Sequence, residues 1–225
     1  MGKKQSVRRS RPASPRSTNW VLIGGVVIGG VLILAALLIL STQQTEAETL
    51  ASYCDNNPGA CYALGNPDAP VTMVEVADFG CTFCRNFHVE TLPALVSQYV
   101  ESGRMRFIVL PYALSDNTLP AANASMCAGE QGQYFPFADG MYYNFDDPTI
   151  RTRDGFFRVA AALDLDIEQF TQCVNEARYN ATVRSNMRAA ASNGVSSTPT
   201  FFINNARVNG ALPLATFQQR INALP

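Results

Sequence analysis

Two cysteines three residues apart, in the tetrapeptide Cys81-Thr82-Phe83-Cys84, constrain the fold of this chain more than any other feature. A short apolar run over residues 71–77 precedes them and is typical of a buried strand. We expect a helix to begin at about Thr82, so that Cys81 lies at its N-terminus. At that position, unpaired backbone N–H groups and the helix dipole stabilise a thiolate. The order of strand, loop and helix therefore predicts that the two cysteines are presented for chemistry.

The spacing of this pair indicates thiol–disulfide exchange. In a C-x-x-C motif at a helix N-terminus, the pKa of the first cysteine falls from about 8.5 to about 3.5–7.5. Cys84 lies one helical turn further on, is close enough to form a disulfide with Cys81, and is expected to be less exposed. We predict that Cys81 is the exchanging sulfur and Cys84 the resolving thiol.

A zinc site or a purely structural bridge is the competing interpretation of the same two cysteines. Structural zinc needs four ligands, which usually come from a second C-x-x-C or a histidine pair. The chain has a single histidine, His88, and no second C-x-x-C. We therefore expect redox chemistry with neither a metal nor another cofactor, and we expect His88 to pack in the fold rather than to act as a base.

Two segments of the chain resemble a known family. The segment 74–88, which contains the cysteine pair, is similar to the active-site segment of membrane-anchored, DsbA-like thioredoxin-fold proteins. The segment 194–204, with Thr198-Pro199 before an apolar run, resembles the cis-proline loop of that fold. The resemblance covers about residues 70–225. Many relatives have proline after the first cysteine, where this chain has Thr82, so the oxidising strength does not carry over.

The resemblance implies an α/β thioredoxin fold with an inserted helical subdomain at about residues 119–193, because helical patterns fill that stretch between two predicted strands. Cys127 and Cys173 both fall in this insert, and related extracytoplasmic proteins often bridge such a pair. We expect them to form a structural disulfide. Six cysteines permit 15 pairings, however, so the other pairings stay open.

Glu75 is the residue that the apolar run would not predict. A buried carboxylate without a partner is costly, and desolvation should raise its pKa, which suits a proton acceptor. In thioredoxin-fold oxidoreductases an acid at the matching position lies beneath the active site, so the resemblance implies that Glu75 helps to move the proton of Cys84. The alternative is a partly exposed glutamate at the end of the strand.

Thr198 and Pro199 are expected to complete the site. An X-Pro bond adopts the cis form at a cost of only about 0.5–1 kcal/mol. With Pro199 in place, the backbone of Thr198 is predicted to pair with an extended substrate peptide by strand addition. The alternative is an ordinary trans proline in a turn before a strand.

The net charge of −1 conceals an asymmetry between the N-terminal tail and the remainder of the chain. Residues 1–19 carry six basic and no acidic side chains, and all other residues together carry a net charge of −7. The basic tail is rich in serine and proline and stands beside an apolar segment, so nothing here indicates a nucleic-acid surface. We expect this cytoplasmic tail to be disordered.

The segment 20–40 contains 21 uncharged residues, which is long enough to span a hydrocarbon core of about 30 Å as one transmembrane helix. We interpret it as a signal anchor that places the N-terminus in the cytoplasm and residues 41–225 outside the cell membrane. The alternative is a long signal peptide, cleaved near Ala47 or Ala51. Residues 41–69 are expected to form a polar linker that carries Cys54 and Cys61.

Cys54 and Cys61 enclose a turn signal, Asn57-Pro58-Gly59, so that a local disulfide between them is the expectation. An auxiliary redox pair that relays electrons to a membrane partner is the alternative, and free or intermolecularly paired thiols are a third possibility.

These features together predict an extracytoplasmic thiol–disulfide oxidoreductase that introduces disulfides into reduced, exported polypeptides. The resemblance implies that a membrane oxidase of the DsbB or vitamin K epoxide reductase type reoxidises it. Two alternatives stay open. One is a thiol reductase or disulfide isomerase with the same site, and the other is a non-enzymatic peptide-binding or chaperone module.

Overall fold

The computed structural model describes residues 2, 30, 32–34 and 48–225. The chain divides into two units, Met1–Glu46 and Ala47–Pro225. The predicted tail at 1–19 and the predicted anchor at 20–40 fall almost entirely outside the described residues. Among the helices that are described, none combines the length and the apolar character needed to cross a membrane.

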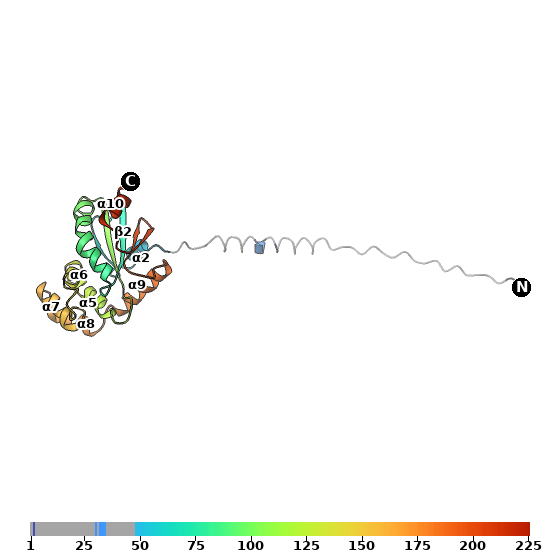
Figure 1. The fold of residues 1–225 in the computed structure, drawn as a ribbon. Coiled ribbons are helices and arrows are strands. Elements are labelled where there is room, and N and C mark those ends of the chain that lie inside the picture. The colour runs from blue at the N-terminus through green and yellow to red at the C-terminus, as the bar shows by residue number, and fades with distance from the viewer. Residues whose placement is uncertain (1, 3–29, 31, 35–47) are drawn as a thin grey trace. The chain divides into compact units, whose positions relative to one another are not determined.

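A mixed five-stranded sheet forms the centre of the second unit (Figure 1). Its strands are β1 (Tyr62–Leu64), β2 (Val71–Ala77), β3 (Met105–Pro111), β4 (Thr200–Ile203) and β5 (Ala206–Asn209). The order across the sheet is β1-β3-β2-β4-β5, with β2 and β3 parallel and the other neighbours antiparallel. The strand predicted at 71–77 is therefore the middle strand, where a near-continuous apolar sequence is expected.

Helices make up most of the rest of the unit. The elements before the insert are α2 (Leu50–Asn56), α3 (Thr82–Asn86), η1 (Phe87–Thr91), α4 (Leu92–Leu95) and η2 (Val96–Val100). The later helices are α5 (Leu119–Gly129), α6 (Tyr134–Tyr143), α7 (Arg153–Ala162), α8 (Ile167–Asn175), α9 (Asn180–Ser192) and α10 (Leu214–Asn222).

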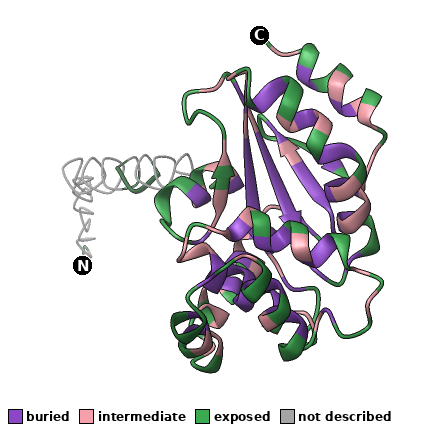
Figure 2. Ribbon diagram, turned by 90° about the vertical axis from the view of Figure 1, so that its left-hand side faces the viewer, coloured by how far each residue is buried: buried purple, intermediate pink, exposed green. Residues whose placement is uncertain are grey.

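Both faces of the sheet are covered, so its strands are buried between helices (Figure 2). Side chains alternate across β2: Val74 and Val76 pack in one cluster with Leu50 of α2 and Ala190 of α9. Met73 belongs to the other cluster, together with Phe87 and Phe217. The α3–η2 segment and α10 thus cover the face opposite α2 and α9.

The helix that follows the cysteine pair changes its hydrogen-bonding pattern along its length. The structure alternates between α-helical turns and two π-helical turns, η1 and η2. The backbone N–H of Leu92 bonds to the carbonyl of Phe87, five residues earlier. Pro93 has no backbone N–H, so this residue donates no helical hydrogen bond, and the helix continues past it.

The N-terminal boundary predicted for the domain needs correction. Residues 41–69 were expected to be a linker, but α2 and β1 belong to the fold. Leu50 and Cys54 are 1% and 8% exposed and pack against the sheet, and β1 pairs with β3. Two buried residues at i and i+4 suffice to dock a helix of seven residues, which is too short to be recognised from its pattern.

The helices α5–α9 form the predicted insertion between β3 and β4, and most of them lie beyond one end of the sheet (Figure 1). Nine of the eleven residues of α5 are buried. A disulfide joins Cys127 of α5 to Cys173 of α8, with an S–S distance of 2.04 Å. It is the pair that the resemblance implied, and it ties two helices that are 46 residues apart in sequence.

Candidate active site

The loop between β2 and α3 is fixed by a buried carboxylate. Asp78 is fully buried and accepts hydrogen bonds from the backbone N–H of Gly80 at 2.6 Å and of Leu114 at 2.8 Å, and from the Thr118 hydroxyl at 2.6 Å. A Cβ atom at Gly80 would lie 2.6 Å from Cγ2 of Thr118, so the close approach requires glycine. The hydrogen bonds of Asp78 and the close packing of Gly80 therefore both fix the turn that precedes Cys81.

Cys81 caps the N-terminus of α3. Its Sγ accepts a hydrogen bond from the backbone N–H of Cys84 at 3.4 Å, and its thiol donates to the carbonyl oxygen of Thr198 at 3.2 Å. The pKa of the Cys81 thiol is lowered to about 6, chiefly by the hydrogen bond from the Cys84 thiol. Thr198 and the backbone N–H groups of Phe83 and Cys84 lower it further, while burial opposes the shift.

Cys84 has the opposite character. It is fully buried, whereas Cys81 is 9% exposed, and both are free thiols. Burial raises the pKa of Cys84 well above its ordinary value, and the hydrogen bond to Cys81 and the negative charge of Glu75 act in the same direction. The pair is thus asymmetric: Cys81, which is slightly exposed, is easily ionised, and the fully buried Cys84 holds its proton.

The cis-proline loop reaches this pair from a distant part of the sequence. The Thr198–Pro199 peptide bond is cis, and Thr198 contacts Cys81 across 117 residues. The carbonyl of Pro199 accepts from the backbone N–H of Gly210, which holds the loop against the end of the β4–β5 hairpin. The cysteine motif and the proline motif, which were recognised separately in the sequence, lie together in the fold.

Glu75 lies in the middle of β2 and is fully buried. Its Oε2 is 2.9 Å from Nε2 of His88, which is 2% exposed. The His88 ring stacks on Tyr142 with 4.3 Å between ring centroids. The sequence indicated a role in packing for His88, and its pairing with Glu75 was missed. The available signal was that a buried acid needs a partner and that His88 stands four residues after Cys84 on the same helix.

An exposed apolar side chain marks the surface beside the cysteines. Phe83, between Cys81 and Cys84, is 62% exposed. It borders a groove of about 380 Å³ that runs between the start of the α3–η1 helix and residues 211–214 before α10. Large exposed apolar residues next to a concave surface are typical of sites that bind a partner.

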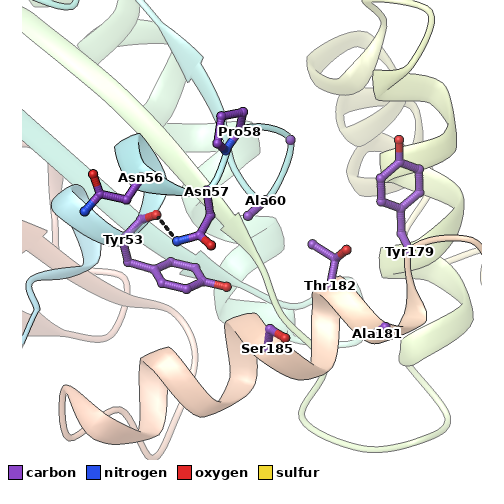
Figure 3. Close-up of a pocket in the computed structure, with 10 residues that line it drawn as sticks. Tyr53, Asn56, Asn57, Pro58, Ala60, Tyr179, Ala181, Thr182 and Ser185 are labelled. Atoms are coloured by element: carbon purple, nitrogen blue, oxygen red, sulfur yellow. Dashed lines mark hydrogen bonds between the residues drawn. The ribbon is translucent and has the colours of Figure 1, made fainter.

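Cys54 and Cys61 form a second disulfide, with an S–S distance of 2.06 Å. The loop that it closes borders a cavity of about 530 Å³, which faces α9 (Figure 3). Within this loop Asn57 donates a side-chain hydrogen bond to the carbonyl of Tyr53 at 2.8 Å (Figure 3).

No group of three or more His, Cys, Asp or Glu side chains with the arrangement of a metal site occurs in the part of the chain that the structure describes.

Comparison with known proteins agrees with this geometry. The family model described as thioredoxin matches residues 57–223. Among solved structures, alpha-DsbA1 of Wolbachia pipientis superimposes with a TM-score of 0.67 and 27% identity, over 75% of this chain and 92% of that protein.

Two curated relatives have different overall organisations. The probable disulfide bond formation protein D of Bacillus anthracis is 28% identical over 154 residues, which are 65% of this chain and 71% of that protein. The Na⁺/H⁺ antiporter NhaA 3 of Salinispora tropica is 32% identical over 157 residues, which are 68% of this chain. This chain spans only 23% of the antiporter's length.

Proposed function

This chain belongs to the thioredoxin family and is a DsbA-like thiol–disulfide oxidoreductase, and from this premise we propose that it introduces disulfides into exported polypeptides through Cys81 and Cys84. The observation that supports oxidation of the substrate, rather than its reduction, is that the pKa values of the two cysteines shift in opposite directions. A pKa of about 6 at Cys81 means that its thiolate is stable at neutral pH. A stabilised thiolate favours the reduced enzyme, so the oxidised enzyme is a strong oxidant.

The order of steps in disulfide transfer follows from the fact that Cys81 is the more accessible of the two cysteines. A substrate thiolate attacks Sγ of Cys81 in the oxidised pair, the Cys81–Cys84 bond breaks, and Cys84 departs and takes up a proton. A second substrate thiolate then attacks the substrate sulfur of the mixed disulfide, and Cys81 leaves as a thiolate. Two electrons pass from the substrate to the enzyme, and the substrate gains one disulfide.

Reoxidation requires the buried thiol to lose its proton. We assign this role to Glu75, whose charge already acts on Cys84 and which lies on the same face of the sheet as the α3–η2 helix. Proton transfer to a positioned carboxylate is a common form of general base catalysis. The electrons are then passed to a membrane oxidase of the DsbB or vitamin K epoxide reductase type, which is the partner that the resemblance implies.

Substrate binding is assigned to the surface around Cys81. An extended peptide would pair with the backbone of Thr198 by strand addition, as other sheet-edge recognition sites do. The groove beside Phe83 would take an apolar side chain of the same peptide. This combination suits unfolded polypeptides, because it depends on backbone and on general apolar character rather than on one sequence.

The location of the enzyme is part of the proposal. Six basic residues precede the uncharged segment 20–40, and this arrangement favours a cytoplasmic N-terminus with the catalytic unit on the other side of the cell membrane. An oxidising compartment also suits the two additional disulfides.

The equilibrium redox potential of Cys81/Cys84 against glutathione tests this function. We expect a value near or above about −150 mV, toward the oxidising end of the known range. A value near about −270 mV or lower would instead establish a reductase that uses the same residues. A parallel sample with Cys54 and Cys61 changed to alanine tests the auxiliary pair, because an unchanged potential and an unchanged rate of oxidation by the membrane partner indicate a structural bond.

A further inference from the structure

The buried pair of Glu75 and His88 has an unused hydrogen-bonding atom at each end. Oε2 of Glu75 and Nε2 of His88 face each other, but Oε1 of Glu75 and Nδ1 of His88 have no hydrogen-bond partner among the described residues. Buried polar atoms without partners are rare and are often functional. The two atoms are the outer ends of a short chain that runs from carboxylate to imidazole.

Cys84 lies close to this chain, on the same helical segment as His88. Cys84 and His88 are four residues apart on one helical segment, and residues at that spacing share a face. The negative charge of Glu75 contributes to the raised pKa of Cys84, which places the carboxylate within electrostatic reach of the thiol.

The His88 end of this chain reaches a pocket that is separate from the cysteine surface. His88 lines a cavity of about 360 Å³, which we call the His88 pocket. Leu64, Leu92, Val96 and Phe135 form its apolar walls, and Asp139, an exposed residue of α6, stands at its rim. The pKa of the Asp139 carboxyl is raised by its apolar surroundings, and the charge of His88 opposes that shift.

The groups around His88 leave few alternative routes for a proton. Glu75 faces it from β2, and Tyr142, Asp139 and Tyr143 face it from α6. Burial raises the pKa of the Tyr142 hydroxyl well above its ordinary value, so this tyrosine holds its proton and serves as a stacking partner. Leu92 and Val96, further along its own helix, are apolar.

We propose that His88 relays protons between Glu75 and the His88 pocket, so that the proton of Cys84 enters and leaves through a pocket that shares no lining residue with the groove beside Phe83. The relay deepens the proposed function and rests on it. It accounts for how a fully buried thiol can exchange its proton while a polypeptide covers Cys81.

The steps balance over one catalytic cycle. During reoxidation Cys84 gives its proton to the Glu75 carboxylate, the protonated carboxyl group rotates so that this proton faces His88 and passes to Nε2, and the imidazolium releases its Nδ1 proton into the pocket. During reduction a proton from the pocket binds Nδ1, the Nε2 proton returns to Glu75, and Glu75 protonates Cys84. The neutral imidazole changes tautomer in each half-cycle and is restored by the next.

The test follows resolution of the mixed disulfide between Cys81 and glutathione in the full-length protein. Reduced protein is mixed with oxidised glutathione, quenched with acid at successive times, and the adduct is quantified by mass. The His88→Gln variant can still donate a hydrogen bond to Glu75 but cannot pass a proton through two nitrogens. Glu101→Gln is the matched control, since Glu101 follows the same helical segment, is exposed, and lines neither the groove beside Phe83 nor the His88 pocket.

We expect His88→Gln to slow resolution at about pH 7 by about ten- to a hundredfold, up to the lower end of the range for a positioned proton-transfer group. Glu101→Gln should resolve at the wild-type rate. The equilibrium constant with glutathione should stay within about twofold, because a relay changes rates in both directions and leaves the equilibrium unaltered. In His88→Ala, added imidazole should enter the enlarged pocket and restore the rate.

Several results would overturn the relay: a wild-type rate in His88→Gln, an equilibrium constant that shifts as much as the rate, or no response of His88→Ala to imidazole. If the variants do not fold, the wild type still decides, because a rate limited by proton transfer should be lower in deuterium oxide than in water, and equal rates in the two solvents contradict the relay. A wild-type protein that never forms or resolves the adduct would refute the proposed function itself. Normal resolution in the wild type and in His88→Gln alike would refute only the relay.

Discussion

Ionisation of Cys81 should make the stability of the reduced protein depend on pH in a way that the oxidised protein does not share. The pKa of this thiol is about 6 in the folded state and 9.0 in the unfolded chain. An acid with a lowered folded pKa adds stability where it is ionised. Its contribution is complete above the unfolded value and disappears as the pH falls through the folded value. In the oxidised protein Cys81 is held in a disulfide and does not titrate.

The expected size of the effect follows from these two values. Between about pH 5 and about pH 7 the free energy of unfolding of the reduced form should rise, relative to the oxidised form, by about 1.4 kcal/mol, and by about 2.6 kcal/mol at about pH 8. Cys84 does not disturb this window, because its pKa is raised in the folded state and its ordinary value of 9.0 lies above it. Groups common to both forms cancel in the difference.

The assay is urea denaturation of both redox forms at each pH, followed by circular dichroism. One equivalent of dithiothreitol should reduce the Cys81–Cys84 pair selectively, and alkylation with mass analysis verifies that the other two disulfides persist. Cys84→Ala lacks the largest contribution to the low pKa of Cys81 and cannot form this disulfide, so it is compared with the Cys81→Ala/Cys84→Ala double variant, and the rise in that difference should move to higher pH. A difference that is constant across this range, or that falls with pH, would refute the assignment of a stabilised thiolate to Cys81.

Three further substitutions test the structure around the site, each by its free energy of unfolding in urea. Replacing Cys127 and Cys173 together with alanine should lower it by about 4 kcal/mol, from the entropy of a closed loop of 46 residues, with wild-type stability as the contrary result. Phe217→Ala removes a fully buried ring and should cost about 3–5 kcal/mol, whereas a cost below about 1 kcal/mol would contradict its place in the core. Asp78→Ala leaves three donors without their acceptor and should cost at least about 3 kcal/mol, while also slowing alkylation of Cys81; an unaffected alkylation rate would show that the loop does not depend on this carboxylate.

The central strand and the C-terminal hairpin were predictable because short-range chemistry determines them. The apolar run at 71–77 is β2 without adjustment. Asn204 and Asn205 turn the hairpin in the left-handed region, with φ of +42° and +71°, and asparagine tolerates this conformation better than most residues. In both places the local sequence pattern favours the same structure that the surrounding fold stabilises.

The elements that were missed are those that depend on tertiary contacts. Helix α2 is seven residues long and β1 is three, so neither carries a periodic signal of its own. They are stabilised by Leu50 and Cys54 against the sheet and by pairing with β3. The π-helical turns around Pro93 depend likewise on packing that the sequence pattern does not show.

The features of the candidate site also divide into those that the sequence predicted and those that it did not. The position of Cys81 at a helix N-terminus followed from spacing alone, and the contact with Thr198 was implied only by the resemblance. A partner for Glu75 was required by the cost of burying a charge, but the sequence could not show that His88, thirteen residues later, would face it. That pairing depends on how the α3–η2 helix lies across β2.

The distance in sequence between the two halves of the site has a consequence for biosynthesis. Cys81 acquires its contact with Thr198 only when residues 117 positions later have been made and β4 has paired with β2. While the chain is still emerging, its first cysteine pair therefore lacks part of the environment that makes Cys81 reactive. The full insertion, with both of its cysteines, is translated in this interval. Thr198 therefore adds its contribution to the low pKa of Cys81 only after the insertion has been made.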